Sequence, residues 1–63
     1  MPNRNPQPLN TLREGQSFVL SIQGNPSIKI YKHLRSLGDH YSEVEISNGI
    51  VEYMNPRTYV YGL

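Results

Sequence analysis

The chain has 63 residues, a net charge of +1 and no cysteine, which excludes several classes of protein at the outset. A chain this short forms at most one domain, and on folding it buries only about 60% of the surface that it exposes when unfolded. Without cysteine, it has neither disulfides nor thiolate zinc sites to reinforce so small a core. Small domains often gain stability by association, so we expect a protein partner or a homo-oligomer.

The composition is that of a soluble, cytoplasmic protein. No apolar run approaches the ~20 residues that a membrane span requires, so no membrane partner is expected. The N-terminal residues 1–5 carry a charge but are not followed by the apolar stretch of a secretory signal. The net charge is too small to indicate nucleic-acid binding by itself.

Residues 1–12 are predicted to form an extended or flexible arm, ahead of a single small domain over residues 13–63. The arm contains three prolines, which fix φ at about −65° and bias the preceding residues toward extended backbone. Leu9 and Leu12 are apolar exceptions that could pin the arm onto the domain. A free terminus and an arm that orders against a partner both fit this composition. The prolines are Pro2, Pro6 and Pro8.

A half-buried strand is predicted over residues 17–22, where apolar side chains recur at every second position. Phe18, Leu20 and Ile22 share one face of this strand. The segment 23–26, which contains glycine, asparagine and proline, then stops the strand.

A helix is predicted next, over residues 26–37. Asn25 is a favourable N-cap, and Pro26 suits the first helical position because its missing N–H needs no partner there. Gly38 suits the position just after the C-terminus of a helix. At about 100° per residue, three apolar side chains fall on one stripe of this helix. They are Ile30, Leu34 and Leu37.

A strand over residues 27–34 is the rival interpretation of the same segment. Ile28 and Ile30 are β-branched and alternate, as strand residues do. The alternation fails at Lys32, whereas the start signal, the stop signal and the stripe agree on a helix. We therefore expect a helix.

A β-hairpin is predicted around Asn48 and Gly49, the pair that best fits a two-residue type I′ turn. Its strands are expected over residues 41–47 and 50–54. A two-residue turn places Glu45 opposite Glu52. The inner face of the hairpin is then Val44, Ile46, Val51 and Tyr53.

A last short strand is predicted over residues 58–61, after a turn at 55–57. The expected fold is α+β, in the order β-α-β-β-β, with one helix packed on one face of a small, mostly antiparallel sheet. Because it is short and C-terminal, the last strand is the expected exposed edge, with Tyr59 and Tyr61 on one side of it.

Basic residues on the predicted helix form the first candidate site, because lysine and arginine supply most non-specific affinity for nucleic acid. The ordinary alternative is a solvated helix surface. Arg4 and Arg13 of the arm would add phosphate contacts. The helix residues are Lys29, Lys32, His33 and Arg35.

Acidic residues on the outer face of the predicted hairpin form the second candidate site: Glu43, Glu45 and Glu52. They would either extend freely into water or serve as a cation site or a docking patch for a basic partner. Together with the basic helix, they predict a domain that is basic on its helix side and acidic on its sheet side.

Tyrosine is the third candidate, with five copies in the chain. Tyr59 and Tyr61 would present two aromatic side chains to a partner or to nucleic-acid bases, if the last strand is an edge. The β propensity of tyrosine explains the same pattern without any function. Tyr53 is expected in the core.

Catalysis and metal binding are not expected. His33, Asp39 and His40 do not have a metal-ligand spacing, and no serine lies in a nucleophile motif. We expect no cofactor and no small-molecule substrate.

The leading hypothesis is a non-enzymatic accessory or assembly module that binds a protein partner, or itself, through a sheet edge and the N-terminal arm. The alternative is a small nucleic-acid-binding protein that uses the basic helix. The expected protein-interface residues are Pro6, Pro8, Leu9, Tyr59, Tyr61, Glu43, Glu45 and Glu52.

Overall fold

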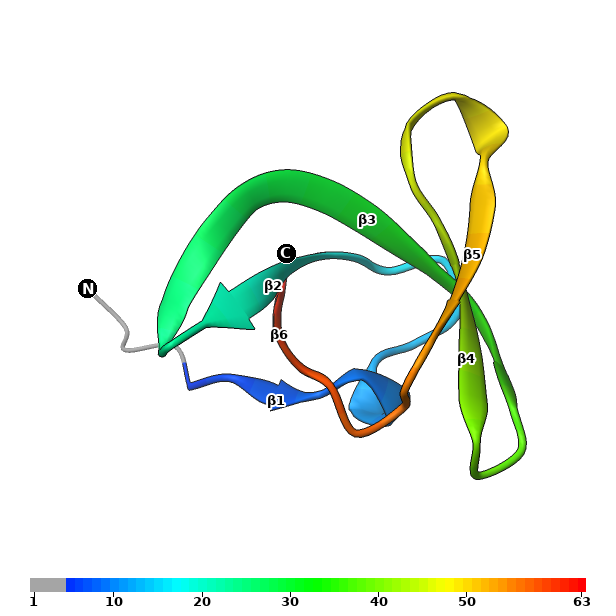
Figure 1. The fold of residues 1–63 in the computed structure, drawn as a ribbon, viewed down its shortest axis with the longest axis horizontal. Helices are drawn as coiled ribbons and strands as arrows, with labels where there is room; N and C mark the ends of the chain where they lie inside the picture. The colour runs from blue at the N-terminus through cyan, green and yellow to red at the C-terminus, as the bar shows by residue number, and fades with distance from the viewer. Residues whose placement is uncertain (1–4) are drawn as a thin grey trace.

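A computed structural model describes residues 5–63, which form one antiparallel sheet of six strands in the order β1-β6-β2-β3-β4-β5 (Figure 1). The expectation of an α+β fold with one helix is wrong, because the only helical elements in this part of the chain are two short 3-10 turns, η1 (Leu9–Thr11) and η2 (Ser47–Gly49). The strands are β1 (Gln7–Pro8), β2 (Ser17–Ile22), β3 (Asn25–Leu37), β4 (Tyr41–Glu45), β5 (Val51–Met54) and β6 (Tyr59–Gly62).

The segment predicted as a helix is the long strand β3, which has 13 residues. Its buried side chains are Tyr31 and His33, two positions apart, whereas Ile30 of the predicted stripe is exposed. The strand pairs with β2 along its first part and with β4 from Lys32 onward. The rival strand interpretation was therefore right, with its alternation carried by Tyr31 and His33.

The residues predicted to begin and end the helix lie beside or in hairpin turns, with Asn25 and Pro26 at the start of β3. Gln23 and Gly24 both have positive φ, 53° and 84°, and Ile22 lies opposite Asn25, so the chain reverses in two residues between β2 and β3. Gly38, with φ of 73°, lies in the turn between β3 and β4. Glycine at these positions accepts the left-handed backbone of a tight turn as well as that of a helix C-terminus.

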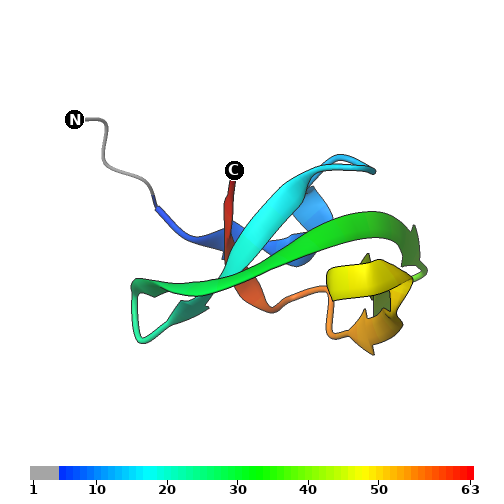
Figure 2. The ribbon, with the colours of Figure 1, turned by 90° about the horizontal axis from the view of Figure 1, so that it is seen from above.

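β3 curves from the group of β1, β2 and β6 to the β4–β5 hairpin, so the sheet has a concave side (Figures 1 and 2). The core packs on this side. Phe18 and Tyr31 stack there, with 5.4 Å between ring centroids. The segment around η1 also joins the core: Leu9 N donates to Thr58 O at 2.8 Å. The buried cluster is Leu9, Leu12, Phe18, Tyr31, Val44 and Val60.

The β4–β5 hairpin turns at Asn48 and Gly49, which have the positive φ values, 64° and 76°, that the sequence predicted. Its register is one residue away from the predicted one. Ile46 N donates to Ile50 O, and Ile50 N donates to Ser47 O, so two residues of one strand face a single residue of the other. Such a β-bulge shifts the register beyond it.

The shifted register turns the side chains of β5 over, because a slip of one residue exchanges the two faces of a strand. Val44 is buried as predicted, but it lies opposite Glu52. Val51 and Tyr53, predicted in the core, are 43% and 60% exposed. The predicted pair of Glu45 with Glu52 does not form, since Glu45 lies opposite Val51.

The last strand, β6, is not an edge. It pairs with β2 on one side and with β1 on the other. The prediction failed because β1 lies within the segment predicted as an arm. Within residues 5–63, the two outermost strands of the sheet are β1 and β5.

Candidate functional site: the β5 edge

Several stretches of strand in the described part of the chain pair on one side only, among them β1, the first part of β3, and β5. β1 has two residues and contains Pro8, and the open part of β3 carries Pro26 and Lys29. Prolines and lysines on an edge hinder pairing with another chain. β5 has neither residue, which makes it the open edge best suited to accept a strand.

The backbone of β5 presents hydrogen-bonding groups to its open side. In an antiparallel pair, residues alternately direct their N–H and C=O groups toward the partner strand and away from it. Ile50 bonds toward β4, through Ile46 and Ser47. By this alternation, Glu52 also faces β4, while Val51 and Tyr53 direct their backbone groups to the open side.

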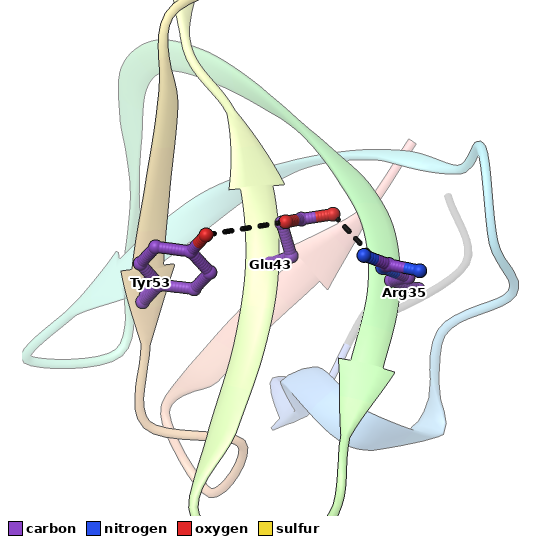
Figure 3. Close-up of polar contacts among 3 residues, drawn as sticks. All are labelled: Arg35, Glu43 and Tyr53. Carbon is purple, nitrogen blue, oxygen red and sulfur yellow. Dashed lines mark hydrogen bonds and ion pairs between the residues drawn. The ribbon is translucent and has the colours of Figure 1, made fainter.

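The outer face of β3, β4 and β5 carries a row of polar contacts that leads to this edge (Figure 3). Arg35 Nε lies 3.1 Å from Glu43 Oε1, and Tyr53 O–H donates to Glu43 Oε2 at 3.4 Å. The row holds the Tyr53 ring in place on the edge strand. Tyr41 adds an edge-to-face ring contact to Tyr53, with 6.5 Å between centroids.

Exposed apolar side chains lie around these polar contacts and next to the open edge of β5. Leu37, Tyr41 and Tyr53 line a shallow hollow on the outer face. Val51, the first residue of β5, and Ile50 just before it are also exposed. An exposed apolar surface next to an unpaired strand is typical of a protein-binding site.

Glu52 is the one acidic side chain on β5. It is exposed, and it makes no ion pair or hydrogen bond with any residue in the range 5–63. Glu43 pairs with Arg35, whereas Glu45 lies opposite Lys32 without a recorded ion pair in the same range. The predicted common acidic face is wrong, because Glu52 lies opposite the buried Val44 and thus on the other face of the sheet from Glu43 and Glu45. Glu52 therefore keeps its charge available to a partner.

The predicted division of charge between two sides of the domain is wrong. Lys32 and Arg35, expected on a basic helix, lie on the same sheet face as Glu45 and Glu43 and alternate with them. Positive and negative side chains thus offset one another across neighbouring strands.

The remaining residues of the predicted nucleic-acid site do not extend this group into a basic band. Lys29 and Lys32 are three residues apart on β3, so their side chains point to opposite faces of the sheet. Lys29 Nζ lies 5.5 Å from the centroid of the Tyr31 ring. His33 is 1% exposed, with Nδ1 3.3 Å from Arg13 O. Arg13 is exposed in the segment before β2. Arg4 lies outside the described residues.

The predicted protein-interface residues near the termini are only partly accessible. Leu9 is fully buried, and Pro6 and Pro8 are half-buried. Tyr61 is 7% exposed, and its O–H donates to Gly24 O. Tyr59 is exposed, in register with Pro8 of β1.

Sequence reasoning missed Ile50, Val51 and Tyr53 as surface residues. Their apolar character and the hairpin signal both assigned the last two to the core. A signal was nevertheless present, because the predicted register placed two glutamates directly opposite each other, which is unfavourable.

Comparison with known proteins adds no relative: no family model, no curated protein and no solved structure matches the chain. Across residues 5–63, no helix has the length and apolarity to cross a membrane. In the same range, no three histidine, aspartate or glutamate side chains come together as a metal site. The function is therefore inferred from the geometry of the chain itself.

Proposed function

We propose that this protein is a small non-enzymatic accessory module that binds a protein partner by adding an extended strand of that partner to β5. The observation that carries the proposal is the open side of β5, a four-residue strand without proline or lysine. Strand addition of this kind obtains affinity from main-chain hydrogen bonds and specificity from alternate side chains.

The edge can supply both contributions. The N–H and C=O groups of Val51 and Tyr53 allow about four inter-strand hydrogen bonds, each with a net value of about 1 kcal/mol. The exposed Tyr53 ring, held by Glu43 and Tyr41, is a preorganised aromatic anchor. Because association opposes these gains with a loss of several kcal/mol in freedom of motion, we expect weak to moderate affinity.

The size of the core gives a second reason to expect a partner. Met54, at the end of β5, is half-buried and packs against the core from one side of the sheet. A ligand that binds only the folded state stabilises it by a free energy that rises with the logarithm of the ligand concentration, once that concentration exceeds the Kd. A strand added to β5 would therefore raise the melting temperature as well as bind.

The prediction of nucleic-acid binding rested on a basic helix over residues 26–37. The helix that was to carry the basic residues is a strand, and two of its cations lie beside glutamates. The described residues offer no observation that favours this alternative.

The test of the proposal is a proline substitution that blocks the edge without breaking the fold. Val51→Pro removes an N–H that points to the open side, so no hydrogen bond within the sheet is lost. The preceding residue, Ile50, already has φ −74° and ψ 127°, which proline accepts after it. Val51→Thr is the matched control, because it keeps the N–H and the β-branched shape.

Three heptapeptides serve as probes: Thr-Thr-Val-X-Val-Thr-Thr, with lysine, glutamine or glutamate at X. Binding is followed by the chemical shifts of the backbone amides during titration. We expect at least one peptide to shift the amides of β5, Val51→Thr to bind within about threefold of the original protein, and Val51→Pro to bind at least tenfold more weakly. Equal binding by the proline variant, or no binding of any peptide, would refute strand addition at β5.

A further inference from the structure

We infer that the partner strand carries a lysine or arginine opposite Glu52, flanked by apolar residues opposite Val51 and Tyr53, and that a second copy of this chain is a poor partner for the same edge. The inference rests on the proposed function. It follows from two features of β5. The open backbone groups of Val51 and Tyr53 set the register of an incoming strand, and Glu52 places a negative charge between them.

Self-pairing places like charges together. An antiparallel pair of two β5 strands that uses both open residues puts Val51 opposite the copy's Tyr53. Glu52 then faces the copy's Glu52 directly, at a position without hydrogen bonds between the two residues. Side chains come closest at such positions, with Cα atoms about 4.5 Å apart. Like charges directly opposite each other destabilise a sheet, so Glu52 disfavours this dimer.

Other symmetric registers avoid the clash but lose backbone contacts. If Val51 lies opposite the copy's Val51, or Tyr53 opposite the copy's Tyr53, only one of the two open residues of each chain takes part in the hydrogen bonds between the copies. About half of the inter-strand hydrogen bonds are then absent. The single charge in the centre of a short edge thus acts against self-association in the way that inward or central charges protect edges in other sheets.

The same geometry favours a basic partner strand. Lysine or arginine opposite Glu52 converts the repulsion into a cross-strand ion pair. No existing side-chain contact has to break, since the Glu52 carboxylate has no ion pair or hydrogen bond within the described residues. Apolar residues on either side would lie over Val51 and Tyr53, which are both exposed on the outer face.

The three heptapeptides test this inference through their order of affinity. At low ionic strength, we expect the lysine peptide to bind most tightly, the glutamine peptide next and the glutamate peptide least, with about tenfold between the extremes. In Glu52→Lys, the order should reverse. Glu14→Lys is the matched control, because it changes the net charge equally at an exposed residue that β3 and β4 separate from β5.

The outcomes separate the two proposals. Peptides that bind β5 with equal affinity, or an order that Glu52→Lys leaves unchanged, would overturn the inference while strand addition stands. A reversal in Glu14→Lys as large as that in Glu52→Lys would also overturn it, since net charge and not position would then govern binding. If no peptide binds β5, both the proposed function and this inference fail.

Discussion

Replacing Ser42 with alanine should stabilise this protein, although the change removes atoms from its core. Ser42 is fully buried on β4, and its Oγ has no hydrogen-bond partner among the described residues. A buried hydroxyl without a partner destabilises the folded state by about 1–3 kcal/mol. Removing the oxygen leaves a void of ~12 Å³, which at ~24 cal/mol per Å³ offsets only about 0.3 kcal/mol. The expected net gain is about 0.7–2.7 kcal/mol.

The gain is large enough to measure in a chain of this size. For a domain of 60–100 residues, 1 kcal/mol moves the melting temperature by about 4–8 °C. Thermal and urea unfolding followed by circular dichroism should therefore separate Ser42→Ala from the original protein. Ser36→Ala is the matched control, because Ser36 lies opposite Ser42 on β3 but is exposed. Destabilisation by Ser42→Ala, or a gain no larger than that of the control, would refute the reasoning.

Three further substitutions test the turn, the packing of β6 and the edge. Gly49→Val should destabilise by about 2 kcal/mol in urea unfolding, because a β-branched residue resists the positive φ there although a Cβ has room, and unchanged stability would contradict the turn geometry. Tyr61→Phe should lower stability by about 1 kcal/mol in the same assay through loss of its bond to Gly24 O, and an unchanged midpoint would place that hydroxyl in water. Glu52→Gln should increase self-association in sedimentation experiments, and an unchanged monomer fraction would show that Glu52 does not protect the edge.

Four of the six strands in the described residues could be predicted from local patterns. The predicted strand over residues 17–22 coincides with β2, and the positive φ values of Asn48 and Gly49 were foreseen from the residue types. The strand predicted over 50–54 differs from β5 by one residue at its start, and the one predicted over 58–61 differs from β6 by one residue at each end. Alternation and turn chemistry are properties of a few neighbouring residues, so sequence shows them directly.

What failed depends on contacts between distant residues. The signals at Asn25, Pro26 and Gly38 fit helix caps and hairpin turns equally well, and the choice was made by β2 and β4, which pair with β3 on its two sides. The edge was misplaced because β1, within the predicted arm, covers β6.

The candidate site was misjudged through a single residue of register. The bulge at Ile46 and Ser47 turns Val51 and Tyr53 outward, and nothing in the local sequence marks it. Glu43 and Glu45 lie on the outer face as predicted, but Glu52 lies on the other face, opposite Val44. Arg35 pairs with Glu43, and Lys32 lies opposite Glu45, only because β3 is a strand beside β4.

Hydrogen exchange of the β5 amides measures the availability of the edge and its occupation in one experiment. In the free protein, the amides of Val51 and Tyr53 should exchange rapidly, while that of Glu52, which faces β4, should exchange more slowly. Saturation with the lysine heptapeptide should slow exchange at Val51 and Tyr53 at least tenfold. Amides of Val51 and Tyr53 that are already protected in the free protein, or that stay unprotected in the saturated complex, would contradict strand addition at β5.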